Sequence, residues 1–239
     1  MSALRYEVRQ AMTAPRETTS GAAVSAVFDL DRTITVRGTF TPFLLFCLWR
    51  QGRLLRGVPG IVAAMAAYVR QAIDRKTFKE RMLAVTIAGL TRGEVARFAD
   101  MFVDRLMAGG LRPGAERAIE RHRAAGHTLI MVTASFDFLA ERIGRRLGFD
   151  AVVSTRSTWD RHARLLPLID GENCYGPAKI RALAAVSALT QGRHVIAYSD
   201  HHTDAPLFEW ASDAVAVNPT SKLRRLAKAR GMKIEDWNA

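Results

Sequence analysis

Two aspartates, Asp29 and Asp31, lie one residue apart at the end of an apolar strand in the segment VSAVFDLDRTITV, residues 24–36. Carboxylates that are held close together repel one another, so a nearby cation must compensate their charge. Magnesium suits this position because it takes hard oxygen ligands and binds one or two carboxylates together with phosphate oxygens. The pair therefore predicts magnesium-assisted phosphoryl transfer through a covalent carboxylate.

Two further strands, predicted at 127–132 and 194–198, also end in polar residues, and a lysine follows Gly176-Pro177 at the start of the helix between them. Each feature alone is typical of a helix cap, a turn or a solvated side chain. The carboxyl ends of parallel strands, however, meet at one edge of a sheet, where α/β proteins bind their ligands. The side chains expected at this edge, besides the aspartate pair, are Thr133, Ser135, Lys179, Asp200 and Asp204.

Each of these groups has an expected role in phosphoryl transfer. Asp29 is predicted to be the nucleophile and a metal ligand, because attack by a carboxylate divides hydrolysis into two easier steps. Asp31 is predicted to protonate the leaving oxygen and then to activate water. Asp200 is the expected second metal carboxylate, and Thr133 and Lys179 are expected to hold the phosphate oxygens on which charge develops.

The elements that position these groups alternate regularly after residue 112. A first strand is predicted at 24–29, and the chain from 39 to about 108 has a helical pattern throughout. Alternating strands and helices imply a parallel sheet with right-handed crossovers. We therefore expect an α/β, Rossmann-like parallel sheet with helices on both faces and an all-helical insert after the first strand. After residue 112, helices are predicted at 114–125, 136–148, 177–190 and 220–231, and strands at 127–133, 151–154, 194–199 and 214–217.

The motifs DLDRT, VTAS and SDHHTD, with Lys179 between the last two, resemble those of the haloacid dehalogenase superfamily of aspartate-nucleophile phosphatases. The resemblance covers about residues 24–230 and is strongest to the subgroup with phosphoserine phosphatases and a bacterial phosphatidylglycerophosphatase. It implies that the insert is a cap domain and that Mg²⁺ is the cofactor. It also implies the following site: catalytic Asp29 and Asp31; metal ligands Asp29, Asp31 and Asp200; phosphate-binding Thr133, Ala134 and Lys179; and supporting Asp204. The predicted division is a flexible tail at 1–22, a core at 23–37 and 112–239, and a cap at 38–111.

The sequence also departs from this family pattern. Gly38 stands where phosphoserine phosphatases carry an acidic residue for the substrate ammonium group, which argues against phosphoserine itself. Arg32 stands where small residues are usual, with no role assigned. His201 and His202 are interpreted as loop residues or outer contacts, because imidazole is a poor ligand for Mg²⁺.

The substrate therefore stays open. The expected function is a phosphomonoester hydrolase for a small anionic phosphorylated substrate, with an aspartyl-phosphate intermediate. One alternative is a phosphatase of a glycerol- or lipid-linked phosphate such as phosphatidylglycerophosphate. Further alternatives are a phosphotransferase and a catalytically silent regulatory binding protein. The residues between 50 and 81 are rich in basic and apolar side chains, which suits an anionic substrate.

Composition narrows the class of partners. The chain has 239 residues, a formal net charge of +12 and a sequence pI near 10.6, which favours anionic partners. The arginines are scattered and no nucleic-acid module is recognisable, so sequence-specific nucleic-acid binding is not expected. Cys47 and Cys174 have no metal-site spacing and are interpreted as buried thiols. The first 22 residues lack the apolar stretch of a secretory signal, and a cytoplasmic location is expected.

Two charge-free stretches, 38–49 and 57–69, are too short to cross a bilayer, which needs about 20 apolar residues. We expect them to be buried helices of the insert. The alternative is a surface-seeking pair of helices with a basic elbow, which would place the protein peripherally on an anionic membrane.

Overall fold

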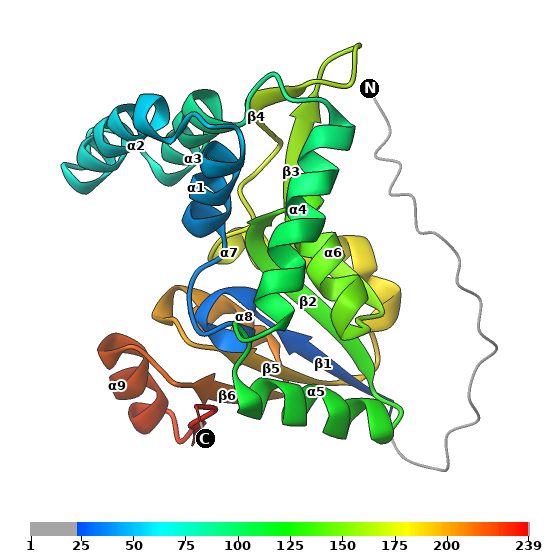
Figure 1. Cartoon of the computed structure of the whole chain (residues 1–239). Coiled ribbons are helices and arrows are strands. Elements are labelled where there is room, and N and C mark those ends of the chain that lie inside the picture. Colours follow the sequence, from blue (N-terminus) through cyan, green and yellow to red (C-terminus); the bar gives the residue numbers. More distant parts are fainter. Residues whose placement is uncertain (1–22, 239) are drawn as a thin grey trace, which may run out of the picture.

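A seven-stranded sheet forms the centre of the molecule, with the strand order β4-β3-β2-β1-β5-β6-β7 (Figure 1). The computed structural model describes residues 23–238, so the tail predicted at 1–22 lies outside the described residues. All neighbouring strands are parallel except β3 and β4, which are antiparallel. The strands are β1 (Val24–Phe28), β2 (Thr128–Phe136), β3 (Ala151–Trp159), β4 (Leu165–Asp170), β5 (His194–Ser199), β6 (Asp213–Val217) and β7 (Lys233–Glu235).

Strand β1 lies at the middle of the sheet and is buried on both faces. Successive side chains of a strand point to opposite faces, so Ala26 and Phe28 pack into one apolar cluster and Val27 into the other. Phe28 is in register with Met131 of β2 and Tyr198 of β5. The residue after β1 therefore emerges at the centre of the sheet edge.

Helices cover both faces of the sheet, as predicted. Helices α5 and α6 contribute to the cluster that contains Phe28, and α7, α8 and α9 pack on the opposite face. This confirms the expected Rossmann-like architecture. The helices are α5 (Pro113–Ala124), α6 (Asp137–Leu147), α7 (Pro177–Leu183), α8 (Ala205–Trp210) and α9 (Ser221–Ala229), with short turns η1 (Leu30–Ile34), η2 (Ala184–Leu189) and η3 (His202–Asp204).

Four helices follow β1 before the sheet resumes, namely α1 (Phe40–Arg50), α2 (Leu54–Val69), α3 (Arg75–Thr86) and α4 (Arg92–Met107). In Figure 1 the first three project from one end of the molecule, and α4 runs beside α6. Arg142 of α6 pairs with Asp100 of α4 at 2.7 Å, and Arg146 pairs with Asp104 at 2.5 Å. These exposed ion pairs join the helical region to the sheet-covering helix.

The predicted burial of the two charge-free stretches is only half right. Helix α1 buries Phe43, Leu44 and Cys47 as expected, but α2 leaves much of its apolar surface exposed. None of the helices within residues 23–238 has the length and apolar character that a membrane span requires. Both cysteines are free and buried, which confirms the interpretation as buried thiols.

The sequence did not predict β4 or β7, and it predicted β3 to end at 154. In the structure β3 continues to Trp159 and pairs with β4 as an antiparallel hairpin. This hairpin contacts α3, because Ile169 N–H donates to Glu80 Oε1 at 3.0 Å. The predicted helix at 177–190 ends at Leu183 and continues as a 3₁₀ turn. Short strands of this kind depend on their pairing partners more than on their own pattern.

Candidate active site

The turn η1 carries the chain from β1 into the helical region and fixes the first aspartate. Asp29 N–H donates to Tyr198 O at 2.9 Å, so strand pairing continues to the sheet edge. The turn is broken at Arg32, which has a left-handed backbone with φ 64°. Two bonds hold this conformation, from Arg32 N to Thr35 Oγ1 at 3.2 Å and from Arg112 Nε to Arg32 O at 3.0 Å. Arg32 itself is exposed at the cavity wall.

Asp29 and Asp200 come from adjacent strands and meet at one hydroxyl group. Thr33 Oγ1 lies 3.0 Å from Asp29 Oδ2 and 3.5 Å from Asp200 Oδ1, and it accepts the N–H of Asp200 at 3.0 Å. All three residues are buried. Sequence reasoning did not single out Thr33, although it is the last residue of the DLDRT motif.

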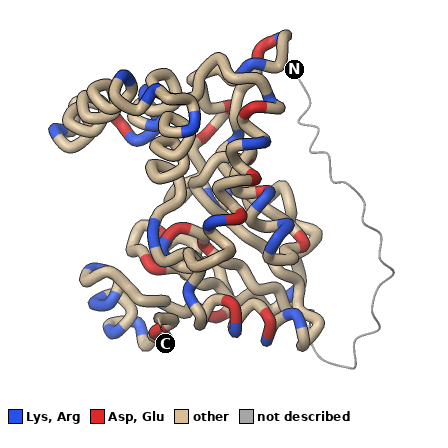
Figure 2. Tube along the Cα trace, in the orientation of Figure 1, with Lys and Arg blue, Asp and Glu red and all other residues tan. Residues whose placement is uncertain are grey.

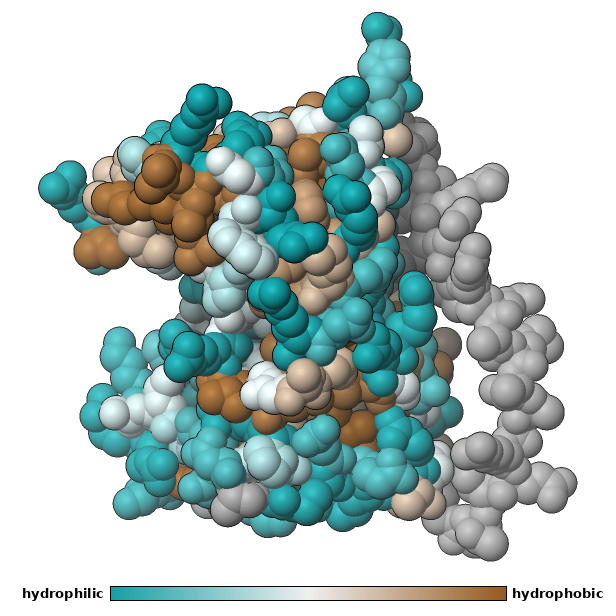
Figure 3. Space-filling view, viewed as in Figure 1, coloured by the Kyte–Doolittle hydropathy of each residue, from teal (hydrophilic) through white to brown (hydrophobic). Residues whose placement is uncertain are grey.

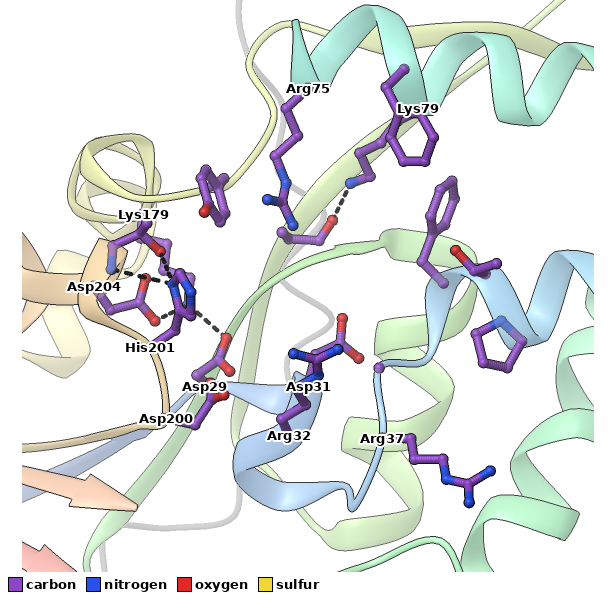
Figure 4. A pocket seen from close by; sticks show the side chains of 18 of the residues that line it. Asp29, Asp31, Arg32, Arg37, Arg75, Lys79, Lys179, Asp200, His201 and Asp204 are labelled. Carbon is purple, nitrogen blue, oxygen red and sulfur yellow. Dashed lines mark hydrogen bonds and ion pairs between the residues drawn. The ribbon is translucent and has the colours of Figure 1, made fainter. Parts of the chain in front are cut away.

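Lys179 reaches the same point from the start of α7. Gly176 precedes this helix with φ 56°, a conformation that favours glycine, and Pro177 opens the helix. The Nζ atom of Lys179 lies 2.6 Å from Asp29 Oδ1 and 2.6 Å from Asp204 Oδ2 (Figure 4). Ser199 Oγ also donates to Asp204 Oδ2 at 2.6 Å. Asp204 therefore contacts both Lys179 and Ser199, and its supporting role stays a prediction.

The electrostatics of these groups follow from burial and crowding. Burial raises the pKa of Asp29 to about 7, with Lys179 opposing the rise and Asp204 and Asp200 adding to it. Burial, together with Asp204, raises the pKa of Asp200 to about 6. Burial alone would lower the pKa of Lys179, but the carboxylates of Asp204 and Asp29 raise it above its ordinary value. Lys179 is therefore charged, but this one ammonium group does not fully compensate the negative charge of the buried carboxylates.

These residues fit a divalent cation. Asp29 and Asp204 contact the Lys179 ammonium group, Asp200 meets Asp29 at the Thr33 hydroxyl, and carboxylate oxygens are the hard ligands that Mg²⁺ prefers. No group of three or more His, Cys, Asp or Glu side chains within residues 23–238 is arranged to hold a metal ion. The best-placed protein ligands are therefore the two carboxylates that meet at Thr33, a number that leaves coordination positions for phosphate oxygens.

Asp31 faces the cavity at a different position. Its Oδ1 atom accepts the N–H of Thr39 at 2.7 Å, in the loop that leads to α1. Its assignment as a metal ligand stays a prediction. Ala134 also lines the cavity, whereas Thr133 is fully buried and its hydroxyl accepts the N–H of Ser135 at 3.0 Å.

A cavity of about 660 Å³ lies between these residues and the helical region. Its charged side chains divide by position: the acidic ones gather at the sheet edge, and basic ones from α3 face them across the cavity (Figure 4). Lys79 is 4% exposed, donates to Ala134 O and to Asn173 Oδ1, the latter at 2.9 Å, and lies over the Phe136 ring. Burial, with a contribution from Arg75, lowers its pKa to about 7.

Arg75 stacks on Tyr175, with its guanidinium carbon 3.8 Å from the ring centroid. Arg37 and Tyr68 also line this side of the cavity. The sequence shows a basic segment between residues 50 and 81 but could not indicate which of its cations face the site, since helical spacing does not fix the orientation of the helix. Lys79 and Arg75 are therefore site residues that sequence reasoning did not assign.

His201 and His202 follow Asp200 directly in the chain, at the sheet edge. His201 lines the cavity, and its Nδ1 atom is 2.9 Å from Thr203 Oγ1. Burial lowers the pKa of His201, and the neighbouring His202 lowers it further. The Nδ1 atom of His202 is buried without a hydrogen-bond partner among the described residues. Neither ring is grouped with the carboxylates as a metal ligand set within residues 23–238.

A Rossmann-like sheet with a buried aspartate–lysine pair at the carboxyl ends of its strands, together with helices inserted after β1, places the chain in the α/β class with a helical insert. The chain belongs to the haloacid dehalogenase-like hydrolase family, whose model matches residues 26–209. It is an enzyme of the phosphatase type, as the motifs predicted.

Relatives support this assignment. Protein CicA of Caulobacter vibrioides is 32% identical over 189 residues, 78% of this chain and 82% of that protein. Phosphoserine phosphatase SerB1 of Mycobacterium tuberculosis is 27% identical over 221 residues, 89% of this chain and 70% of that protein. A crystal structure of a protein of unknown function from Bordetella pertussis shares the fold, with a TM-score of 0.81, 24% identity, and coverage of 91% of this chain and 100% of that one.

Proposed function

We propose that this chain is a Mg²⁺-dependent phosphomonoester hydrolase that forms an aspartyl-phosphate on Asp29. The observation that carries the proposal is that each oxygen of the Asp29 carboxylate has its own contact. One oxygen is bonded to Lys179 at 2.6 Å, and the other lies 3.0 Å from the Thr33 hydroxyl that also meets Asp200. This arrangement fixes the orientation of the nucleophile at the floor of the cavity.

In the first step, an oxygen of Asp29 forms a bond to phosphorus while the bond from phosphorus to the ester oxygen breaks. The leaving oxygen receives a proton from Asp31, which faces the cavity two residues along the chain. In the second step, Asp31 takes a proton from water, the water oxygen bonds to phosphorus, and Asp29 is released. Lys179 opposes the negative charge that gathers on the phosphate oxygens.

Mg²⁺, when bound, supplies the positive charge that lets a carboxylate approach a phosphate dianion. Asp29 and Asp200 would hold it, and Thr33 would keep their oxygens in place. Residues 38–111 form the cap in this proposal, and they supply the contacts to the part of the substrate beyond the phosphate.

Replacing Thr33 with valine is expected to raise the Mg²⁺ concentration for half-maximal activity by about ten- to 100-fold, as loss of an outer-shell partner does in metal sites. Valine keeps the shape of the side chain but leaves the Asp200 N–H without its acceptor. A magnesium titration of phosphate release measures the effect. Thr33→Ser, which keeps the hydroxyl, is the control and should resemble the wild type. Equal magnesium requirements in Thr33→Val and Thr33→Ser would contradict the role.

The charges of the cavity favour an anionic substrate. The basic side chains that face the cavity include Arg75 and Lys79 of the cap and Arg37, which directly precedes it, and no acidic side chain from residues 38–111 is among those that line it. Gly38 offers no carboxylate to an ammonium group. A phosphate ester that has a second anionic group and no ammonium group therefore fits better than phosphoserine. A lipid-linked phosphate is the second candidate, because Tyr68 of α2 lines the cavity while the adjoining Val69 is 72% exposed.

Phosphate release from a panel of esters, with and without Mg²⁺, tests the function. The panel contains p-nitrophenyl phosphate, phosphoserine, phosphoglycolate, glycerol phosphate and phosphatidylglycerophosphate. Magnesium-dependent release is expected, with phosphoserine a poor substrate. Release that does not depend on Mg²⁺ would contradict the mechanism. Transfer of phosphate to an acceptor without free phosphate would indicate a phosphotransferase, and magnesium binding without turnover would indicate a regulatory binding protein.

Replacing Arg75 with glutamine is expected to raise KM for phosphoglycolate by about tenfold, the loss of one charge-assisted hydrogen bond. KM for p-nitrophenyl phosphate, which has no second anionic group, should change little. Steady-state kinetics on both esters measure the difference. The matched control is Arg70→Gln, which removes an exposed cation of the same helical region that does not line the cavity. An equal rise in KM for both esters would contradict the assignment.

A further inference from the structure

Helix α2 carries a continuous line of exposed apolar side chains, here called the α2 stripe. Its members are Leu55, Val58, Val62, Met65 and Val69, which are 90%, 37%, 59%, 37% and 72% exposed. The spacing alternates between three and four residues, so all five lie on one side of the helix. At 1.5 Å per residue the stripe is about 21 Å long. Figure 3 shows the corresponding hydrophobic surface over α2, at the free end of the helical region.

The orientation of the α2 stripe is fixed by close packing on another face of the helix. Gly57 lies against Leu48 of α1, where an added Cβ would come within 2.5 Å of a leucine methyl carbon. Gly60 lies similarly close to Val85 of α3, and Ile61 and Ala64 are buried. Rotation of the helix to bury the stripe would break these contacts. The exposed apolar surface is therefore built into the fold, and surfaces of this kind mark interaction sites.

Along the chain, the charged residues that flank the α2 stripe up to Asp74 have one sign. Arg56 is the only charged residue among the 16 of α2. Between Asp31 and Asp74 the sequence contains six arginines and no acidic residue. In Figure 2 this part of the trace shows blue and tan segments, with red returning only beyond α2. The arginines of this segment are Arg32, Arg37, Arg50, Arg53, Arg56 and Arg70.

Helix α1, which precedes α2, also carries an exposed tryptophan. Trp49 at the end of α1 is 51% exposed, and the guanidinium groups of Arg50 and Arg105 lie 5.5 and 5.3 Å from its ring centroid. Tryptophan side chains concentrate at the boundary between water and lipid, where one end is apolar and the other is hydrated.

We infer that the α2 stripe docks in the plane of a membrane surface that carries anionic lipid headgroups. A lipid boundary offers both things that the stripe lacks, an apolar layer for its side chains and negative charge for the flanking arginines. A second copy of this chain is a poorer occupant. Whether two stripes paired in parallel or antiparallel, the arginines at one end would meet arginines of the partner.

This surface is adjacent to the cavity. Tyr68 lines the cavity, and the next residue, Val69, is the last member of the α2 stripe. Docking would therefore bring the cavity close to the headgroup layer. The docking inference itself does not depend on turnover, because no member of the stripe lines the cavity.

Flotation of the full chain with lipid vesicles tests the inference. We expect binding to vesicles of mixed phosphatidylcholine and phosphatidylglycerol, weaker binding at high salt, and little binding to phosphatidylcholine alone. Val62→Ser combined with Val69→Ser should weaken binding to the mixed vesicles by at least about tenfold, since each buried methylene contributes. Arg53→Gln combined with Arg56→Gln should weaken it and reduce its dependence on salt. Leu168→Ser, at a 49% exposed apolar position outside the stripe, is the matched control and should bind normally.

Hydrolysis of p-nitrophenyl phosphate in solution, measured on every variant, separates this inference from the proposed function. The serine variants should hydrolyse this ester at the wild-type rate, and vesicle binding should be the same with or without phosphatase activity. Wild-type protein that remains unbound to anionic vesicles would overturn the inference. Equal binding by the serine variants would also overturn it. A dimer in solution that the serine variants convert to monomer would assign the stripe to a second copy instead.

Discussion

Replacing Asp29 with asparagine is expected to lower phosphate release from p-nitrophenyl phosphate by more than about 10³-fold. Asparagine has almost the shape of aspartate but cannot form the bond to phosphorus, and it removes one of the two metal carboxylates. The remaining contacts of Lys179 with Asp204 and of Thr33 with Asp200 should keep the fold. The initial rate at saturating Mg²⁺, together with the thermal transition of the variant, measures the effect.

The control for this substitution is Asp100→Asn. Asp100 is exposed on α4 and pairs with Arg142 at 2.7 Å, far from the cavity lining. This variant should keep wild-type activity. A folded Asp29→Asn protein that retained activity within tenfold of wild type would exclude Asp29 as the nucleophile, and would leave Asp31 as the carboxylate to test.

Replacing Lys179 with methionine is expected to lower the free energy of unfolding by about 3–5 kcal/mol, the usual loss when one partner of a buried ion pair is removed. Lys179 is 2% exposed and compensates both Asp29 and Asp204 at 2.6 Å. Methionine fills the space but leaves these carboxylates without a cation. Urea denaturation at neutral pH without Mg²⁺ measures the difference.

Helix α7 provides a matched control two residues further along. Arg181 pairs with Glu172 at 2.9 Å, but both side chains are exposed to solvent. Arg181→Met should therefore have a stability close to wild type. The double variant with Lys179→Met and Asp29→Asn should be more stable than Lys179→Met alone, because one unpaired carboxylate is gone. Similar losses for Lys179→Met and Arg181→Met would show that the buried cation is not needed for stability.

Together these two substitutions separate two roles of one residue cluster. In the proposed mechanism Asp29 acts on phosphorus, whereas Lys179 compensates the buried carboxylates of Asp29 and Asp204 before any ligand arrives. The pKa values of Asp29 and Asp200 are raised because both groups are buried and neighbouring carboxylates add negative charge. A site of this kind is suited to gain stability from a divalent cation.

The sequence by itself determined the core architecture and predicted which side chains gather at its edge. Apolar strands that end in DLD, TAS and SDHHTD can form only a parallel sheet whose carboxyl ends gather these groups at one edge. The Thr91–Glu94 capping box at the start of α4 was likewise readable, because its two bonds are local. The helix-covered faces followed from the same alternation, whereas the strand order was not predicted.

Only the tertiary structure decided the contacts between distant segments. Thr33 contacts Asp200, 167 residues further along the chain, and Lys79 reaches Ala134 across the cavity. The hydrophobic pattern of the sequence also did not predict the hairpin of β3 and β4 or the exposure of the α2 stripe. Periodicity shows that a helix has an apolar side but not which neighbour covers it. In α2 two glycines let one face approach its neighbours closely, and this packing, which no local signal encodes, left the other apolar side facing outward.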